Sequence, residues 1–65
     1  MNERERIGVI LRELREQQGL SQEKVSELSG VGQGHVARIE QGKYSVGIDT
    51  LAKLAKVYGK EIHLI

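Results

Sequence analysis

Apolar side chains recur every three or four residues along the first quarter of the chain. This spacing places them on one face of a helix, and the polar residues between them fall on the opposite face. The pattern predicts an amphipathic helix over about residues 3–18. Gly19 follows, and glycine readily takes the left-handed conformation that ends a helix, so we expect the helix to stop there. The apolar positions are Ile7, Ile10, Leu11 and Leu14.

A second, shorter helix is predicted over residues 22–29. Ser21 precedes it, and its hydroxyl can accept a hydrogen bond from a free backbone N–H of the first turn, worth about 1 kcal/mol. We expect Val25 and Leu28 to be buried. Gly30 is expected to close the helix.

Two further helices are predicted between glycines. The first covers about residues 33–41, where Val36 and Ile39 form the apolar side. The second covers residues 48–58. Its apolar stripe consists of Ile48, Leu51, Leu54, Ala55 and Tyr58.

The last five residues, 61–65, alternate polar and apolar side chains before an apolar pair. Alternation with a period of two is typical of a strand. The whole pattern therefore predicts a single all-α domain over residues 1–65, with four helices in a compact arrangement and a short C-terminal strand.

The composition limits how such a domain is stabilised. Sixty-five residues allow one small core, and with two Tyr and no Phe or Trp this core must be aliphatic. The absence of cysteine excludes disulfides and thiolate metal sites. No apolar run approaches the roughly 20 residues that cross a bilayer, and the N-terminus lacks the apolar stretch of a secretory signal. We therefore expect a cytoplasmic protein that does not bind membranes.

The predicted helices at 22–29 and 33–41, with the turn between them, have the length and glycine punctuation of a helix-turn-helix. In that motif the second helix lies in the DNA major groove. The net charge of +1 does not by itself indicate a nucleic-acid partner, so the distribution of charge must decide. The outward positions of the helix at 33–41 are polar or small, and the N-terminal half of this helix has no carboxylate to repel phosphates. They are Gln33, Gly34, His35, Ala37, Arg38 and Gln41.

Several spaced elements together resemble the phage repressor and Cro-like helix-turn-helix family. The resemblance covers roughly residues 7–58. It rests on the run LREQQGLSQEKV that begins at Leu14, on Gly30-Val31, on RIEQGK from Arg38, and on IDTLAKLA from Ile48. The resemblance implies a repressor-like four-helix fold that binds double-stranded DNA through the helix at 33–41.

Carried over by position, the resemblance implies individual roles. Gln22 would touch a phosphate and brace the recognition helix. Gln33 would contact a base edge, since a Gln amide can pair with adenine N6 and N7. Arg38, one turn further on, would reach a guanine or a phosphate. Lys43 and Tyr44 would lie along the DNA backbone.

The resemblance also implies an ion pair between Arg15 and Glu40, which would make Glu40 a structural residue and not a base reader. One departure from the family concerns Gly34, which stands where relatives often place a base-contacting side chain. Specificity would then also depend on His35 and on Ala37, whose methyl group can contact thymine.

The sequence gives no support for an enzyme or a bound cofactor. His35 and His63 do not form a metal-ligand spacing with any carboxylate. A nucleophile paired with a base is absent as a recognisable motif. Gly32 and Gly34 are not followed by the Gly-Lys-Ser/Thr of a phosphate-binding loop.

The leading hypothesis is a transcriptional regulator, a repressor that binds a palindromic operator as a homodimer. Paired half-sites would supply the specificity that one small motif lacks. Ile62, Leu64 and Ile65 would form the dimer contact by antiparallel pairing of the tails. One alternative is an antitoxin that represses its own promoter and holds a toxin protein. Another is a helical protein-interaction module that does not bind DNA.

Overall fold

The computed structural model describes residues 1–64, which contain four helices and no strand. The helices are α1 (Glu3–Gln17), α2 (Gln22–Ser29), α3 (Gln33–Glu40) and α4 (Ile48–Val57). All four helices predicted from the hydrophobic pattern are therefore confirmed. α2 has the predicted bounds, and the other three end one residue earlier than predicted.

The first two helices begin at side-chain caps. Asn2 Oδ1 accepts the backbone N–H of Glu5 at 2.9 Å, and the Glu5 carboxylate accepts the Asn2 N–H in return at 3.0 Å. Ser21 Oγ accepts the N–H of Lys24 at 3.0 Å, as the sequence predicts. Gly19 has φ +67° and turns the chain out of α1, which confirms its predicted role.

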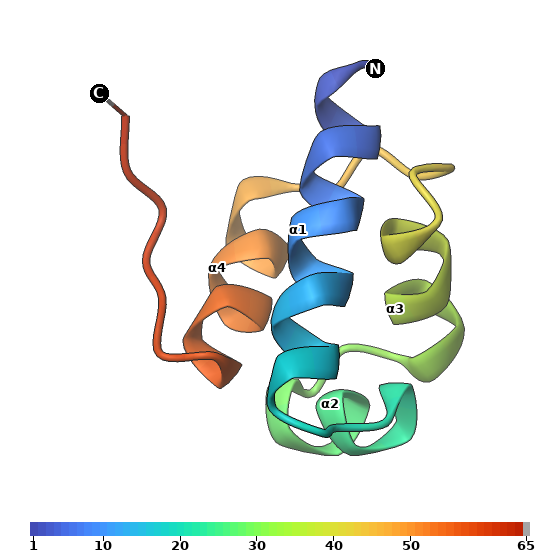
Figure 1. Cartoon of the computed structure of the whole chain (residues 1–65), viewed down its shortest axis with the longest axis vertical. Coiled ribbons are helices and arrows are strands. Elements are labelled where there is room, and N and C mark those ends of the chain that lie inside the picture. Colours follow the sequence, from blue (N-terminus) through green and yellow to red (C-terminus); the bar gives the residue numbers. More distant parts are fainter. Residues whose placement is uncertain (65) are drawn as a thin grey trace.

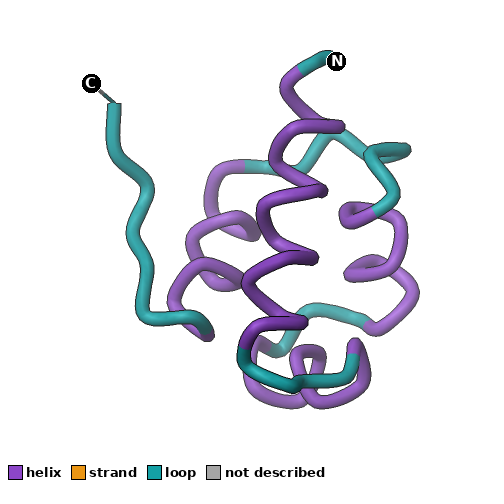
Figure 2. The backbone as a smooth tube through the Cα atoms, in the orientation of Figure 1, coloured by secondary structure: helices purple, strands orange, loops and turns teal. Residues whose placement is uncertain are grey.

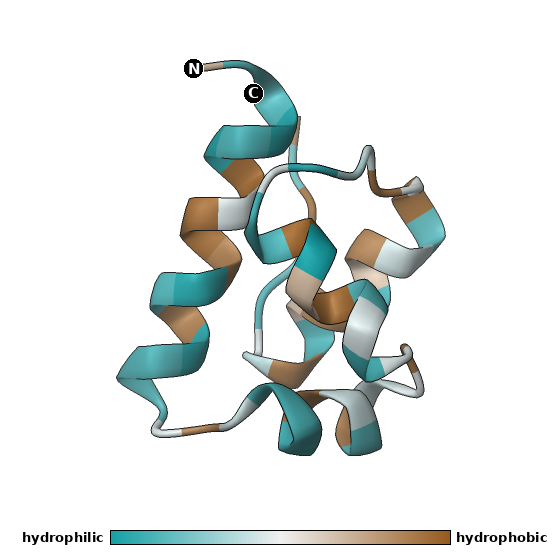
Figure 3. Ribbon diagram, turned by 90° about the vertical axis from the view of Figure 1, so that its right-hand side faces the viewer, coloured by the Kyte–Doolittle hydropathy of each residue, from teal (hydrophilic) through white to brown (hydrophobic). Residues whose placement is uncertain are grey.

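The helices surround one small core. α1 lies between α3 and α4 in the view of Figure 1, and α2 crosses their lower ends. α1 packs against α3, and α2 packs against both α3 and α4. Apolar and polar segments alternate along each helix in Figure 3, as one-sided burial requires. The buried apolar side chains at the centre are Leu11, Val25, Val31, Val36, Ile39, Leu54 and Tyr58.

Three apolar side chains that the periodicity placed in the core lie on the surface, so these predictions were wrong. Leu28 is 56% exposed, Ile10 41% and Ile48 71%. Ile48 is the first residue of α4, where no other element covers it. Leu28 lies near the end of a helix of only eight residues, at the margin of its packing with α4. Periodicity identifies a helix face, but a neighbouring element must reach each position to bury it.

α1 approaches the end of α3 very closely at one glycine. A Cβ atom placed on Gly8 would lie 2.5 Å from the carbonyl oxygen of Ile39 and 2.8 Å from that of Glu40. Backbone atoms cannot yield as a flexible side chain does, so any larger residue must push the two helices apart. Gly8 therefore sets the spacing between α1 and α3.

The predicted C-terminal strand is not present in residues 61–64, and Ile65 lies outside the described residues. The chain leaves α4 through Gly59 and runs back beside it in an extended path without strand pairing (Figure 2). The last backbone hydrogen bond joins Lys60 N–H to the Ala55 carbonyl at 3.0 Å. A strand needs a second strand to pair with, and within residues 1–64 the chain offers none.

No helix within residues 1–64 is long and apolar enough to cross a membrane.

We predict that Gly8→Ala lowers the free energy of unfolding by about 1–3 kcal/mol, the usual cost of forcing an atom into a packed site. The matched control is Gly34→Ala, the same change in an exposed part of α3, where the nearest neighbour of the new atom is an Arg38 side-chain nitrogen at 3.6 Å. That variant should gain up to about 1 kcal/mol of helix propensity. Urea denaturation followed by circular dichroism measures both, and equal stability of the two variants would contradict the close approach.

Candidate nucleic-acid interface

α3 presents a polar, exposed face while its other side is locked into the core. Val36 and Ile39 are buried and hold the helix against its neighbours. Gln33 and Arg38 are exposed on the opposite side. Five residues of helix rise about 7.5 Å along the axis, and the two positions differ by about 140° around it, so both lie beside the side of α3 that faces away from the core. Both are accessible to solvent, and neither is part of the apolar core.

The single carboxylate of α3 is removed from this face. Glu40 is buried, and its two oxygens accept from Arg15 Nε at 2.8 Å and from Arg15 Nη2 at 3.1 Å. Arg15 also donates from Nη1 to the Leu20 carbonyl at 2.9 Å. This fork joins α1, the turn after it and the end of α3. The hydrogen bond with Glu40 raises the pKa of the Arg15 guanidinium, which stays charged.

A second donor to the same carboxylate comes from α2. Gln22 Nε2 donates to Glu40 Oε1 at 3.1 Å, and the Gln22 side chain is half-buried. The amide therefore braces α3, while its contact with a phosphate stays a prediction. Tyr58 lies near this group: burial, and secondly the charge of Glu40, raise the pKa of its hydroxyl. The resemblance implied that Gln22 braces this helix, but it did not name Glu40 as the partner, and nothing in the 18-residue spacing indicates it.

His35 does not stand freely on the outer face of α3. It is half-buried, and its ring meets that of Tyr44 edge to face, with centroids 4.5 Å apart and planes at 87°. The Nε2 atom is buried and has no hydrogen-bond partner within residues 1–64. The ring thus packs against the loop that follows α3. Its contribution to base contact, expected from the sequence, stays a prediction.

The loop after α3 carries two more of the predicted contact residues. Lys43 and Tyr44 are both exposed, on the chain between α3 and α4. Lys43 N–H bonds to the Arg38 carbonyl at 3.2 Å and Gly42 N–H to the Ile39 carbonyl at 3.1 Å, the pair of hydrogen bonds that ends a helix at a glycine. Gly42 has φ +74°, and a Cβ there would lie 2.9 Å from the Glu5 Cα. The loop therefore lies against the N-terminal part of α1, where the close contact and the positive φ permit only glycine.

Ala37 lies half-buried on α3 between the exposed and the buried side chains. The structure therefore brings Gln33, Ala37 and Arg38 together on one helix, with Lys43 and Tyr44 beyond its end. Ile62 and Leu64, predicted to form a dimer contact, lie on the separate C-terminal segment. Ile65 lies outside the described residues.

Comparisons with known proteins agree with this architecture. A family model described as "Helix-turn-helix" matches residues 11–65. The HTH-type transcriptional regulator PuuR of Escherichia coli is 54% identical over 52 residues, which is 80% of this chain and 28% of that protein. An uncharacterized HTH-type transcriptional regulator of Sinorhizobium fredii is 34% identical over 59 residues, covering 91% of this chain and 77% of the relative.

A solved structure is also similar. A chain of the "Toxin-Antitoxin module from Streptococcus pneumoniae" superposes with a TM-score of 0.78 and 40% identity, covering 95% of this chain and 69% of that one. The chain thus spans most of some similar proteins but little more than a quarter of PuuR.

We predict that Glu40→Gln lowers the free energy of unfolding by about 1–3 kcal/mol. The change leaves the Arg15 guanidinium without its charged partner in a largely buried place. The control is Glu16→Gln, which applies the same change to the exposed partner of Arg12, 3.3 Å away on α1. Exposed pairs of this kind contribute well under 1 kcal/mol. Thermal unfolding of the two variants tests the prediction, and a loss in Glu40→Gln no larger than in Glu16→Gln would refute it.

Proposed function

The chain belongs to the helix-turn-helix family, and we propose that it is a sequence-specific DNA-binding transcriptional regulator that acts as a repressor. The observation that carries this proposal is the face of α3. Gln33 and Arg38 are exposed there, while Glu40, the only acidic residue of the helix, is buried against Arg15. The relatives named as HTH-type transcriptional regulators support the same function.

In this proposal α3 enters the major groove with its N-terminal turn towards the bases. Gln33 pairs with an adenine edge, Ala37 contacts a thymine methyl group, and Arg38 contacts a guanine or a phosphate. The His35 ring packs against the Tyr44 ring and so helps to hold Tyr44 in position. A regulator of this kind would act on chromosomal DNA in the cytoplasm.

Contacts with the DNA backbone come from residues that flank α3. Lys43 and Tyr44 extend from the loop at its C-terminal end, and Gln22 lies at the start of α2. These residues position the helix without distinguishing sequences. Specificity and general affinity are therefore assigned to different side chains, which an experiment can separate.

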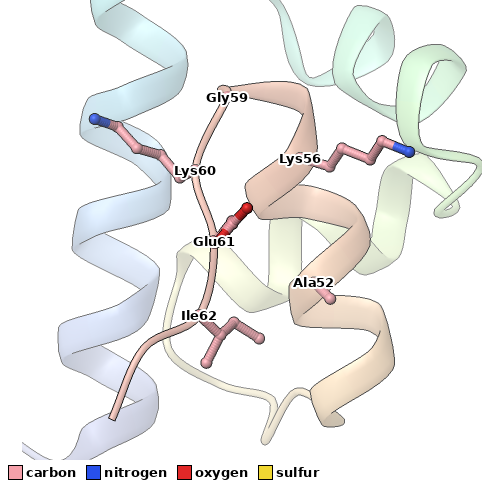
Figure 4. A pocket seen from close by; sticks show the side chains of 6 residues that line it. All are labelled: Ala52, Lys56, Gly59, Lys60, Glu61 and Ile62. Carbon is pink, nitrogen blue, oxygen red and sulfur yellow. The ribbon is translucent and has the colours of Figure 1, made fainter. Parts of the chain in front are cut away.

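We further propose that the protein acts as a homodimer that pairs the C-terminal segments, defined here as residues 60–64. The backbone groups of residues 61–64 make no hydrogen bonds within the described chain. A hollow of about 550 Å³ lies between the segment and α4 (Figure 4), and a second of about 380 Å³ is lined by the segment together with residues of α1 and α4. Leu64 is 99% exposed. An extended segment with free backbone groups and exposed apolar side chains is suited to antiparallel pairing with a second copy.

An antitoxin is the second candidate, favoured by the similarity to a chain of a toxin-antitoxin module. In that case the protein would repress its own promoter and also hold a toxin. Co-purification with the product of a neighbouring gene separates this function from that of a simple repressor. A helical protein-interaction module without DNA binding is the third, and salt dependence distinguishes it, because DNA affinity falls steeply as counterions are released.

We predict that Gln33→Ala weakens binding to the operator by about 1–3 kcal/mol and leaves non-specific binding nearly unchanged. Lys43→Ala should weaken binding to every DNA sequence alike and reduce the salt slope by about one unit. Operator sites selected from random DNA supply the specific target, and fluorescence anisotropy at several salt concentrations measures both variants. An equal loss on all sequences for Gln33→Ala would overturn its role as a base contact.

We predict that deleting residues 61–65 converts the dimer to a monomer in sedimentation equilibrium. Leu64→Ser should weaken the dimer about ten-fold or more, because each copy loses a leucine that the proposed dimer would bury. His63→Ser is the control, an adjacent exposed side chain of opposite orientation in an extended chain. A truncated chain that still sediments as a dimer would contradict the proposed interface.

A further inference from the structure

Leu28 lines a hollow that the proposed DNA contacts leave unused. It is 56% exposed near the end of α2, although Val25, one turn before it, is completely buried. The hollow measures about 420 Å³ and lies between α2 and α4. We call it the α2–α4 groove, lined by Leu28, Ser29, Lys53, Lys56 and Val57.

The two charged side chains that line this groove are both lysines. Lys53 and Lys56 line it from α4, and no acidic residue does. Neither lysine forms an ion pair within residues 1–64, whereas Lys24 on α2 pairs with Glu27 at 3.6 Å. The groove therefore combines an exposed leucine with two cations whose charges nothing in the described chain neutralises.

The position of the groove separates it from α3. In Figure 1, α3 and α4 lie on opposite sides of α1, and the groove is on the α4 side, where α2 meets α4. Figure 4 shows Lys56 and Lys60 extending to opposite sides of the end of α4, and of the two only Lys56 lines the groove. A molecule bound here would leave the exposed face of α3 free.

We propose that the α2–α4 groove docks a short acidic segment of a partner protein, with an apolar side chain against Leu28 and Val57 and carboxylates against Lys53 and Lys56. Charge complementarity selects this occupant. A DNA backbone would use the lysines but would gain nothing from an apolar centre. A second copy offers mixed charge on its exposed helices, as in the Glu3–Arg6 and Arg12–Glu16 pairs of α1.

The size of the groove is sufficient for the side chains of a short helical anchor. A hollow of about 420 Å³ holds a few side chains, as in the recognition of one helix face through positions i, i+3 and i+4. A contact confined to a few side chains should be weak, because stable protein interfaces bury many more residues. Its attraction should also depend on salt, because the lysines are exposed to solvent.

The probe is a synthetic helical peptide of about twelve residues, with leucines at i, i+3 and i+7 and glutamates on both sides of this row. The control peptide has lysine in place of each glutamate. Titration of the full 65-residue chain, followed by amide chemical shifts, should give the largest changes at Leu28, Ser29 and Val57 for the acidic peptide alone. Equal binding of the two peptides, or changes centred on α3, would overturn the proposal.

Variants of the protein locate the site. Lys53→Glu combined with Lys56→Glu should weaken the acidic peptide at least ten-fold, and so should Leu28→Ser, whose circular dichroism shows whether the fold is kept. The matched control is Lys43→Glu, the same substitution on the loop after α3, which should leave peptide affinity unchanged and weaken DNA binding. Peptide affinity that survives the changes at the groove would refute the site.

Two further measurements test whether the groove instead binds DNA or a second copy of the chain. If the double lysine variant lost affinity for DNA as Lys43→Glu does, the lysines would be DNA contacts and the proposal would fail. If Leu28→Ser changed the sedimentation mass, the groove would be an interface between copies, and the proposal would fail equally. Unchanged DNA affinity and unchanged mass, with lost peptide binding, are the results expected.

Discussion

The structure depends on one buried carboxylate. Glu40 ends α3 and accepts hydrogen bonds from Arg15 of α1 and Gln22 of α2, so three helices meet at a single side chain. A buried charge is costly unless it is paired, and the bidentate guanidinium is the partner best suited to it. Apolar packing through Val36 and Ile39 gives the helix its attachment, but such packing has little directionality. The ion pair adds direction, because it fixes how α3 is rotated about its own axis and where its end lies along α1.

The elements of this fold could be predicted from sequence because their ends have local causes. Gly19 and Ser21 act through their own backbone and side-chain chemistry, and the structure has both in the expected roles. The core was predicted less completely. Val25, Val36 and Ile39 are buried as expected, but Leu28 and Ile48 are exposed because a short helix is covered only where another element reaches it. That depends on the arrangement in space, which periodicity does not contain.

The candidate site divides in the same way. The meeting of Arg15 and Glu40, 25 residues apart, followed from resemblance to a family and from no spacing rule, and the match to the helix-turn-helix family model confirms that resemblance. The contact of His35 with Tyr44 depends on how the loop after α3 folds back, and sequence reasoning did not find it. The expected strand at the C-terminus fails within one chain for a different reason. Strand pairing requires two segments, and the sequence of one segment shows only that it is able to pair.

Net charge hides the distribution that matters most for binding. Residues 1–29 contain six acidic and five basic residues, and residues 30–65 contain three acidic and five basic, so the two parts carry −1 and +2. In the first part, four of the five basic side chains are held in ion pairs with acids of the described chain, and Arg4 is the exception; the four are Arg6, Arg12, Arg15 and Lys24. In the second part, Arg38, Lys43, Lys53, Lys56 and Lys60 form no ion pair within residues 1–64.

These uncompensated cations are not spread evenly. Arg38 and Lys43 belong to α3 and its loop, while Lys53 and Lys56 line the α2–α4 groove on the other side of α1. Exposed charges more than about 10 Å apart are largely screened from one another at physiological salt. Because α1, a helix about 10–12 Å across with its side chains, lies between α3 and α4, each cluster acts largely as its own local potential. A nearly neutral chain can in this way present one basic surface to a duplex and a second to an acidic protein, and neither surface is visible in a net charge of +1.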